Sequence, residues 1–184
     1  MALEEYSTEF TRSLIHQTIE LPVPWSAFVQ CLESRLGRYN DDTLKAAKTL
    51  KQLEAAVNAM RGDEPFSIYA IHDHGELSRL AGRNQNARQY TMGNSRIATK
   101  MTVHDIRAAQ HAPIVSLIHE AKPGFTTIEF DLAESVFGGL TEENKECLKV
   151  ARFIDEMRVQ VFKKTKSWWL ELLLDNSKED EDSS

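Results

Sequence analysis

The sequence is poor in cysteine, with only Cys31 and Cys147 among its 184 residues and no Cys-x-x-Cys spacing. This scarcity excludes a disulfide scaffold and a zinc site built from paired thiolates. We expect both thiols to be small buried hydrophobes rather than reactive nucleophiles. A reducing intracellular setting, the cytoplasm, is the simplest account of such sparing use of cysteine.

Long apolar runs are also missing. No stretch of about eighteen apolar residues occurs, so no membrane-spanning helix and no membrane partner are expected. The first ten residues, MALEEYSTEF, lack the apolar segment of a secretory signal. Hydrophobic residues make up 41% of the chain and charged residues 27%, which is typical of a soluble globular domain. We expect a single domain over residues 1–163.

The chain has no excess of positive charge. Its net charge is −6, and the last ten residues, DNSKEDEDSS, contribute −4 of this with five acids and one lysine. The rest of the chain is nearly neutral and offers no general field for nucleic acid, so no nucleic-acid partner is expected. The acidic tail, residues 175–184, contains no apolar residue and is predicted to be disordered.

Several motifs of nucleotide and nucleophile chemistry are absent, namely Gly-x-Ser-x-Gly, the P-loop and Gly-x-Gly-x-x-Gly. The sequence therefore does not support a hydrolase with a nucleophile elbow or a glycine loop around phosphates. No cofactor is expected.

The first half of the chain alternates between strand and helix patterns. Alternating polar and apolar residues predict a strand within 12–23, and Pro24 then opens a helix that Gly37 ends. With Asn40 as its N-cap, a second helix is predicted to carry an apolar stripe from Leu44 to Met60. Residues 65–72 have the apolar and β-branched character of a second strand.

The second half predicts three more strands and a long helix. A short helical segment is expected at 75–82, a strand at 87–93, and a short helix at 103–111 behind a Thr102–Asp105 capping box. The strands at 113–120 and 125–132 form a hairpin through Lys-Pro-Gly. A long helix from residue 142 to at least 162 follows, with an amphipathic helical extension at 164–174.

This order of elements indicates an α+β fold. A mostly antiparallel sheet must bury one face, and the long helices are available to cover it. We therefore predict a two-layer sandwich in which long helices cover a five-stranded sheet, with elements in β-α-β4-α order.

Short motifs in a fixed order resemble the family called domain of unknown function 302. They are Asp73-His74 after a strand, Leu80-Ala81-Gly82 in a turn of helix, Gly93-Asn94 at a strand end, Met101, and Pro113 before an apolar strand. Members usually have Phe-Gly-Asn-Pro at the third motif, where this chain has Met92 and Ser95 in place of Phe and Pro. The resemblance covers roughly residues 10–162, without the extension after Lys163.

The resemblance implies a β-α-β4-α fold of the kind seen in TATA-binding-protein-like domains, and members that are often dimeric. It implies almost nothing about a reaction, because function resides in sites rather than in folds. From it we expect a homodimer.

Five of the six histidines fall within 48 residues: His72, His74, His104, His111 and His119. Because alternate residues of a strand face the same way, His72 and His74 could share a metal ion with His119 and a carboxylate from Glu76 or Glu120. The pattern lacks the later glutamate and the many short strands of a cupin barrel. We therefore favour no metal, and a capping or hydrogen-bonded role for Asp73 and His74.

The stretch Met92–Arg96, MGNSR, contains small residues and backbone amides that can hold a polar group of a ligand. Gly93, Asn94, Ser95 and the family-matched Met101 are the candidate ligand-binding residues. For the stretch itself we favour the alternative, a tight turn in which Gly93 or Asn94 takes a positive φ.

The segment KKTKSWWLELLLD combines three lysines with an apolar stripe of Trp168, Trp169, Leu172 and Leu173. Such a stretch can lie on a membrane or stack on nucleic acid. We favour a helix end that packs on its own domain or on a second subunit.

Two functions remain open. The first is an accessory protein, acting as a homodimer, that binds a partner or a small apolar ligand between the sheet and the long helix. The second is a small enzyme in which Asp73 orients His74 as general base and Asn94 stabilises a developing oxyanion. The enzyme requires Asp73, His74 and Asn94 to meet around one pocket.

Overall fold

The computed structural model describes residues 9, 11–138 and 145–182, with side chains through Asp175. One six-stranded sheet organises the chain in the order β1-β6-β5-β4-β3-β2. All neighbouring strands are antiparallel except β2 and β3, which are parallel. The strands are β1 (His16–Leu21), β2 (Gly37–Arg38), β3 (Ser67–Asp73), β4 (Ala87–Gly93), β5 (Ile114–Lys122) and β6 (Phe125–Asp131).

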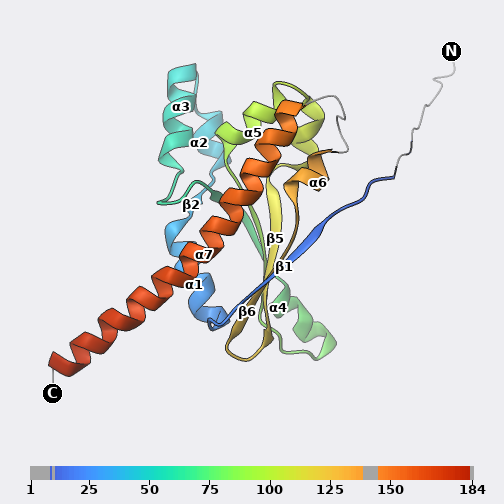
Figure 1. Ribbon diagram of the computed structural model, residues 1–184. Helices are drawn as coiled ribbons and strands as arrows, with labels where there is room; N and C mark the ends of the chain where they lie inside the picture. The colour runs from blue at the N-terminus through green and yellow to red at the C-terminus, as the bar shows by residue number, and fades with distance from the viewer. Residues whose placement is uncertain (1–8, 10, 139–144, 183–184) are drawn as a thin grey trace, which may run out of the picture.

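Two long helices cover one face of this sheet, as Figure 1 shows. Helix α1 (Trp25–Arg35) and helix α7 (Lys145–Asp182) pack together on the inward residues of the strands. The predicted α+β sandwich is thus confirmed in outline. Shorter helices surround it: α2 (Asp41–Lys45), α3 (Leu50–Ala59), α4 (His74–Ser78), η1 (Arg79–Ala81), α5 (Ser95–Thr102), η2 (Ile106–His111) and α6 (Ala133–Gly138).

The core lies between the sheet and these two helices. Ile118 of β5 and Ile128 of β6 are paired in the sheet. Because side chains alternate along a strand, both lie on the face that the helices cover. Phe28 of α1 and Phe162 of α7 meet them there, with ring centroids 6.4 Å apart. Alternate residues of the same strands, such as Leu117 and Glu129, therefore lie on the sheet's other face.

The sixth strand, β2, corrects the prediction of five. It has only two residues, too few for any alternation to be visible in the sequence. Its first residue, Gly37, must lack a side chain, because a Cβ there would come within 2.8 Å of the backbone at Met60, Arg61 and Gly62. The glycine that was interpreted as a helix stop also begins a strand.

The predicted helix with the Leu44–Met60 stripe is in fact two helices, α2 and α3. Asn40 caps α2 as predicted, its side chain accepting a hydrogen bond from the backbone N–H of Thr43. Thr49 then caps α3 by accepting from the N–H of Gln52. Because a new cap interrupts the helix, most of the stripe is not core, and Leu50 remains 80% exposed.

The predicted helix at 103–111 is also wrong in position. The α-helix lies earlier, at α5, and 106–111 forms the 3-10 helix η2 with Asp105 as its cap. The cap of α5 is Asn94, so MGNSR is a strand-to-helix junction rather than a tight turn. Among the described residues only Gly82 and Gly124 have positive φ.

The last helix, α7, continues through Asp182 and so includes most of the tail predicted to be disordered. Helix propagation adds one hydrogen bond for each residue fixed, so an anchored helix can extend into a polar segment. The predicted start at residue 142 lies outside the described residues. Within the described part of the chain, no helix is both long and apolar enough to cross a membrane.

Candidate functional site: an apolar cavity at the start of helix α5

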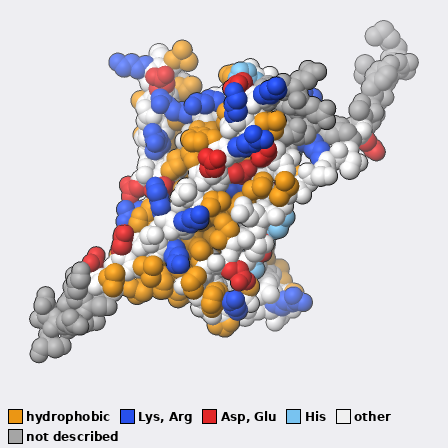
Figure 2. Space-filling view, in the orientation of Figure 1, with side chains coloured by type: hydrophobic (Ala, Val, Ile, Leu, Met, Phe, Trp, Pro, Cys, Tyr) orange, Lys and Arg blue, Asp and Glu red, His pale blue; other side chains and the backbone are white. Residues whose placement is uncertain are grey.

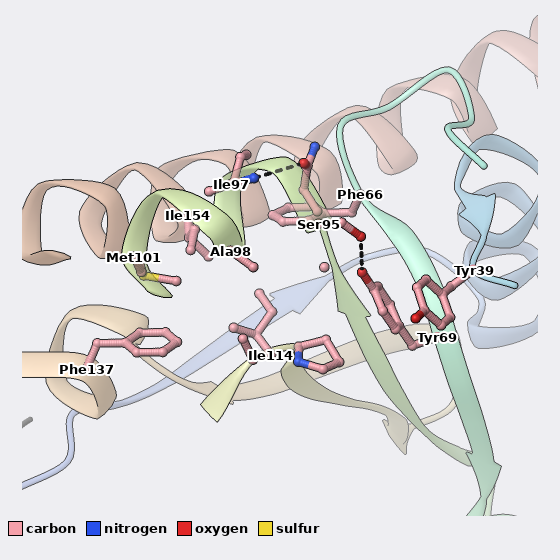
Figure 3. A pocket seen from close by; sticks show the side chains of 14 residues that line it. Tyr39, Phe66, Tyr69, Ser95, Ile97, Ala98, Met101, Ile114, Phe137 and Ile154 are labelled. Carbon is pink, nitrogen blue, oxygen red and sulfur yellow. Dashed lines mark hydrogen bonds between the residues drawn. The ribbon is translucent and has the colours of Figure 1, made fainter. Parts of the chain in front are cut away.

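A cavity of about 210 Å³ lies where β4 ends and α5 begins. Its lining side chains come from segments far apart in the sequence and converge on it, as Figure 3 shows. Ile154 of α7 and Phe137 of α6 form part of its wall, so the cavity sits between the sheet and the long helix. Its lining residues are Tyr39, Phe66, Tyr69, Gly93, Asn94, Ser95, Ile97, Ala98, Met101, Ala112, Pro113, Ile114, Phe137 and Ile154.

Two stacked tyrosines form one side of the cavity. The rings of Tyr39 and Tyr69 lie 4.0 Å apart with an angle of 17° between their planes. The Tyr69 hydroxyl is 2.8 Å from the Ser95 Oγ, and either oxygen can be the donor. The pKa of Tyr39 is raised, first by burial and then by the nearby Asp41 carboxylate. The Tyr39 phenol therefore remains neutral at ordinary pH, and the two stacked rings provide a rigid wall with a polar rim.

Local backbone requirements account for the shape of the opposite wall. A Cβ at Gly93 would lie 3.0 Å from the Pro113 Cβ and 3.5 Å from the Tyr69 ring. Any larger residue at this position would push Pro113 and Tyr69 apart or fill the space between them. Glycine at the end of β4 thus lets strand, proline and tyrosine approach one another around the cavity.

Asn94 acts as a structural joint beside the cavity. Its Oδ1 accepts hydrogen bonds from the backbone N–H groups of Arg96 and Ile97, which caps α5. Its Nδ2 donates to the carbonyl oxygen of Pro65 at 2.6 Å, which ties the cap to the chain two residues before β3 begins. Both ends of the amide are therefore occupied, and Asn94 holds Ser95 and Met101 in place rather than presenting its amide to a ligand.

All four predicted ligand-binding residues, Gly93, Asn94, Ser95 and Met101, line this cavity. The structure brings them together because the first turns of α5 fold over the end of β4. Among the described residues that line the cavity, none is an Asp, Glu, Lys, Arg or His. The wall therefore offers apolar surface and hydroxyls, without an acid–base pair.

The predicted catalytic group of Asp73, His74 and Asn94 is not assembled. In the β3–β4 ladder Asp73 pairs with Arg88 while Ser67 pairs with Gly93, so Asn94 follows the opposite end of the strands. Six strand residues separate the two ends, a distance of about 20 Å at roughly 3.3 Å per residue. The strand register therefore places Asp73 and His74 at one end of the paired strands and Asn94 at the other.

Asp73 instead has a structural role at its own end of the sheet. Its side chain accepts from the N–H of Glu76, which caps α4, and pairs with the Arg88 Nε at 3.1 Å. The Glu76 N–H is the main reason that the pKa of Asp73 lies below its ordinary value, with Arg88 adding to it. His74, the first residue of α4, is exposed.

The three histidines considered for a metal do not form a common site. His72 is exposed on β3, and His119 lies on β5 beyond the intervening β4, with its Nε2 3.6 Å from a Glu129 oxygen. Among the described residues, no group of three or more His, Cys, Asp or Glu side chains is arranged to hold a metal ion.

A second cavity, of about 410 Å³, contains polar groups that the sequence did not reveal. His16 lies at its edge between two carboxylates, 2.9 Å from Asp131 and 2.7 Å from Glu129. The hydrogen bond to Asp131, followed by that to Glu129, raises the pKa of His16. Only the pairing of β1 with β6 brings these residues together, and no local motif marks it.

Arg158 closes this second cavity from the side of α7. Its side chain is only 1% exposed, and its Nη2 donates to the Asp131 carbonyl at 2.8 Å and to Asp155 at 2.7 Å. The guanidinium carbon lies 3.8 Å from the Phe130 ring centroid. Burial lowers the pKa of Arg158, although the group stays charged because Asp155 opposes the shift.

The sequence matches the profile of the family described as Domain of unknown function DUF302 over residues 42–161. The chain belongs to this family. The matched segment contains the motifs from Asp73-His74 to Pro113, although it begins well after residue 10 and so omits the first strand and helix. No curated protein matches the chain.

Among solved structures, this DUF302 chain is similar to the crystal structure of the uncharacterized conserved protein DUF302 from Bacillus stearothermophilus. The two share 12% identity with a TM-score of 0.57, over 82% of this chain and 97% of the other. At this identity the likeness shows a common fold and nothing of function. The expected homodimer and the TATA-binding-protein-like relationship stay predictions.

Proposed function

We propose that this DUF302 chain is a binding domain for a small, largely apolar molecule that carries one hydrogen-bonding group. The cavity at the start of α5 supports this proposal more than any other feature. Binding sites for small molecules are typically concave and mostly apolar, with a few fixed polar groups that orient the ligand. The cavity has this composition, because aliphatic and aromatic side chains surround the hydrogen-bonded hydroxyls of Tyr69 and Ser95.

The size of the cavity limits the ligand. An engineered cavity of about 150 Å³ holds benzene, so about 210 Å³ suits a molecule of roughly six to ten non-hydrogen atoms. Such a ligand is one aromatic ring with a short substituent, or a short branched aliphatic chain.

The hydroxyl pair limits its chemistry. Ser95 and Tyr69 can each donate or accept, so one of them can turn to a ligand hydroxyl, carbonyl or N–H while the other keeps its partner. A charged ligand group would find no counter-charge among the described lining residues, and its desolvation would oppose binding. The proposal therefore favours neutral phenols, indoles and small ketones over carboxylates and amines.

A thermal-shift series of neutral ring compounds tests this function. Indole, p-cresol and toluene are added to the full chain, and benzoate serves as the charged counterpart. At a ligand concentration of 100 Kd, binding adds about 2.7 kcal/mol to stability, which raises the melting temperature by about 5–10 °C. We expect a neutral compound to raise it and benzoate to leave it unchanged.

Two alanine variants give the matched control for this experiment. Ala98 lines the cavity and its side chain points into it in Figure 3, whereas Ala109 is exposed on η2 and does not line it. Ala98→Leu should abolish the shift and Ala109→Leu should keep it. If no neutral compound shifts the wild-type chain, or if Ala98→Leu responds as strongly, the proposed site is refuted.

A further inference from the structure

The second cavity opens where strands β5 and β6 separate. Their pairing begins at Leu117 and Glu129, so the first residues of β5 and the last residues of β6 run apart. The space between them measures about 410 Å³, and apolar side chains of β5, β6 and α6, such as Val115, Phe130 and Val136, form much of its wall. Since a cavity of about 150 Å³ holds benzene, this one suits a molecule of roughly ten to sixteen non-hydrogen atoms.

Two carboxylates lie at the mouth of this cavity. Glu129 and Asp131 alternate along β6 and therefore share the sheet face opposite α1 and α7, where their side chains are 24% and 41% exposed. His16 of β1 bridges them, with Nε2 2.7 Å from Glu129 and Nδ1 2.9 Å from the Asp131 Oδ1. Within the described residues, the other Asp131 oxygen, Oδ2, has no hydrogen-bond donor. The mouth therefore offers hydrogen-bond acceptors with negative charge.

The buried Arg158 does not cancel this charge. Its Nη2 is taken by the Asp155 carboxylate at 2.7 Å and by the Asp131 backbone carbonyl, and only 1% of its side chain is exposed. Its Nε is buried and finds no acceptor in the described part of the chain, although Arg158 lines the cavity. A buried donor without an acceptor is rare in native proteins and points to a partner from outside the chain.

An organic ammonium ion matches this set of groups. An ammonium group has three donors and no acceptor, so it can bind Glu129 and Asp131 together while an apolar body enters the gap between the strands. A carboxylate ligand would be repelled at the mouth. A metal ion does not fit, because no three His, Cys, Asp or Glu side chains of the described residues are arranged to hold one.

The opposite side of the molecule has no comparable charge pattern. Over the face that α7 crosses, basic and acidic side chains are interspersed, as Figure 2 shows. A surface of mixed sign creates no strong field for either kind of ion. Selectivity for a cation therefore has to come from the two carboxylates at the cavity mouth.

We propose that the second cavity binds an organic cation, a primary amine with an apolar body of about ten carbon atoms. Its nitrogen lies between Glu129 and Asp131, and its body lies between β5 and β6. This site goes beyond the proposed function and does not depend on it, although the two cavities share Pro113, Ile114 and Phe137 in their walls.

His16 competes with the amine for the same carboxylates. The charged and titratable side chains around it and along this cavity are Asp131, Glu129, His119, His111, Arg12 and Arg158. Asp131 and then Glu129 raise the pKa of His16 above 6.5, so the ring carries a proton below that raised value and occupies both acceptors. Amine binding should therefore tighten as pH rises through the His16 pKa. Because coupling is reciprocal, the bound amine should lower that pKa.

Calorimetric titrations with phenylbutylamine, phenylbutanol and phenylbutanoate test the charge preference, since the three compounds share one body. They are run well above the His16 pKa on the full chain carrying Ala98→Leu, which fills the first cavity. We expect phenylbutylamine to bind about ten times more tightly than phenylbutanol, and phenylbutanoate to show no saturable binding.

Charge-removing variants of equal shape locate the site. Glu129→Gln/Asp131→Asn should abolish the preference for the amine over the alcohol. Glu20→Gln is the matched control, because Glu20 lies on the same sheet face, is 52% exposed and does not line the cavity. It should keep the preference, and thermal unfolding of each variant checks that it folds. In NMR titrations, phenylbutylamine should lower the His16 midpoint and phenylbutanol should not.

Any of four results would overturn the proposal: no saturable amine binding, equal affinity for amine and alcohol, a preference that survives Glu129→Gln/Asp131→Asn or disappears in Glu20→Gln, or a His16 midpoint that the amine does not move. Amine binding that occurs in the wild type but not in Ala98→Leu would place the amine in the first cavity and also contradict the proposal. Failure of neutral ring compounds to bind the wild type would refute the first site alone, because none of these titrations uses it.

Discussion

At the scale of single residues, Arg158 is the largest fully buried side chain in the described part of the chain. It crosses from α7 to the region where β5 and β6 diverge, and donates to the carbonyl oxygens of Val115 at 3.4 Å and Asp131 at 2.8 Å. The pairing of β5 with β6 begins at Leu117 and Glu129, so the guanidinium binds carbonyl oxygens that lie beyond the paired residues. Its partner Asp155 also accepts from the N–H groups of Ala133 and Glu134, which fastens the start of α6.

Removal of the Arg158 charge should lower the free energy of unfolding. We expect Arg158→Met to destabilise the fold by about 3–5 kcal/mol, because it leaves Asp155 without its buried partner and two carbonyls without a donor. Arg152 lies on α7 as Arg158 does, and Arg152→Met, which breaks an exposed pair with Glu134 of α6, should cost at most about 1 kcal/mol. Urea unfolding of both variants measures the difference. Equal effects would show that the Arg158 network is not important for stability.

His16 should be a pH-sensitive contact of the outer sheet face. Its hydrogen bonds to Asp131 and then Glu129 favour the protonated ring and raise its pKa above the ordinary 6.5. Because the folded pKa is the higher one, this stabilisation is complete below pH 6.5 and is lost as pH rises through the raised value. An NMR titration should place the His16 midpoint above 6.5, and Asp131→Asn should lower it. A wild-type midpoint at or below 6.5 would contradict the structure.

At the scale of elements, the junction of β4 and α5 determines the shape of the cavity. Helix α5 begins only because Asn94 satisfies the first free N–H groups of the helix, and the same amide is anchored to Pro65. Ser95 and Met101 reach the cavity because this helix starts where it does.

Two substitutions separate the cap from the anchor. Asn94→Ala loses both and should cost about 2–3 kcal/mol of unfolding free energy, whereas Asn94→Asp keeps the cap acceptor, loses the donor to Pro65 and should cost about half as much. Denaturant unfolding gives both values. An Asn94→Ala variant as stable as the wild type would show that the junction does not depend on this residue.

Sequence patterns predicted elements well where periodicity was long and poorly where capping decided the outcome. The strand at 65–72 corresponds to β3, and the strand at 87–93 is β4 to the residue. Two helix boundaries were predicted wrongly because a capping residue was missed. Thr49 interrupts one predicted helix, and Asn94 starts another earlier than expected. Asn, Thr and Asp fit both caps and turns, and only the surrounding chain decides between them.

At the scale of the whole molecule, the cavity is a product of tertiary structure. Tyr39, Ile114, Phe137 and Ile154 reach it from segments that no local motif connects. Gly93, Asn94 and Ser95 could be predicted because they are small or polar residues next to one another in MGNSR, and Met101 because it matches a separate family motif. Asp73 and His74, which belong to the same series of motifs, lie at the far end of the strands because antiparallel pairing reverses the chain direction.

A cavity kept for a ligand should lower the stability of the empty protein. We expect Ala98→Leu, which fills part of the space, to stabilise the unliganded chain by about 0.5–2 kcal/mol. Ala109→Leu has no cavity to fill and should change the unfolding free energy by less than about 0.5 kcal/mol. Denaturant midpoints in the absence of ligand give the comparison. A destabilised Ala98→Leu variant would mean that the space is already filled by its own walls.

The most direct measurement for the central claim is an NMR titration of the Met101 methyl group with a neutral ring compound such as indole. Met101 is 1% exposed and lines the cavity, so its methyl signal reports a ligand inside rather than on the surface. We predict a saturable shift of this signal in the wild-type chain that is absent from Ala98→Leu. A Met101 signal that stays in place up to the solubility limit of every neutral compound, or that moves equally in both proteins, would contradict the account.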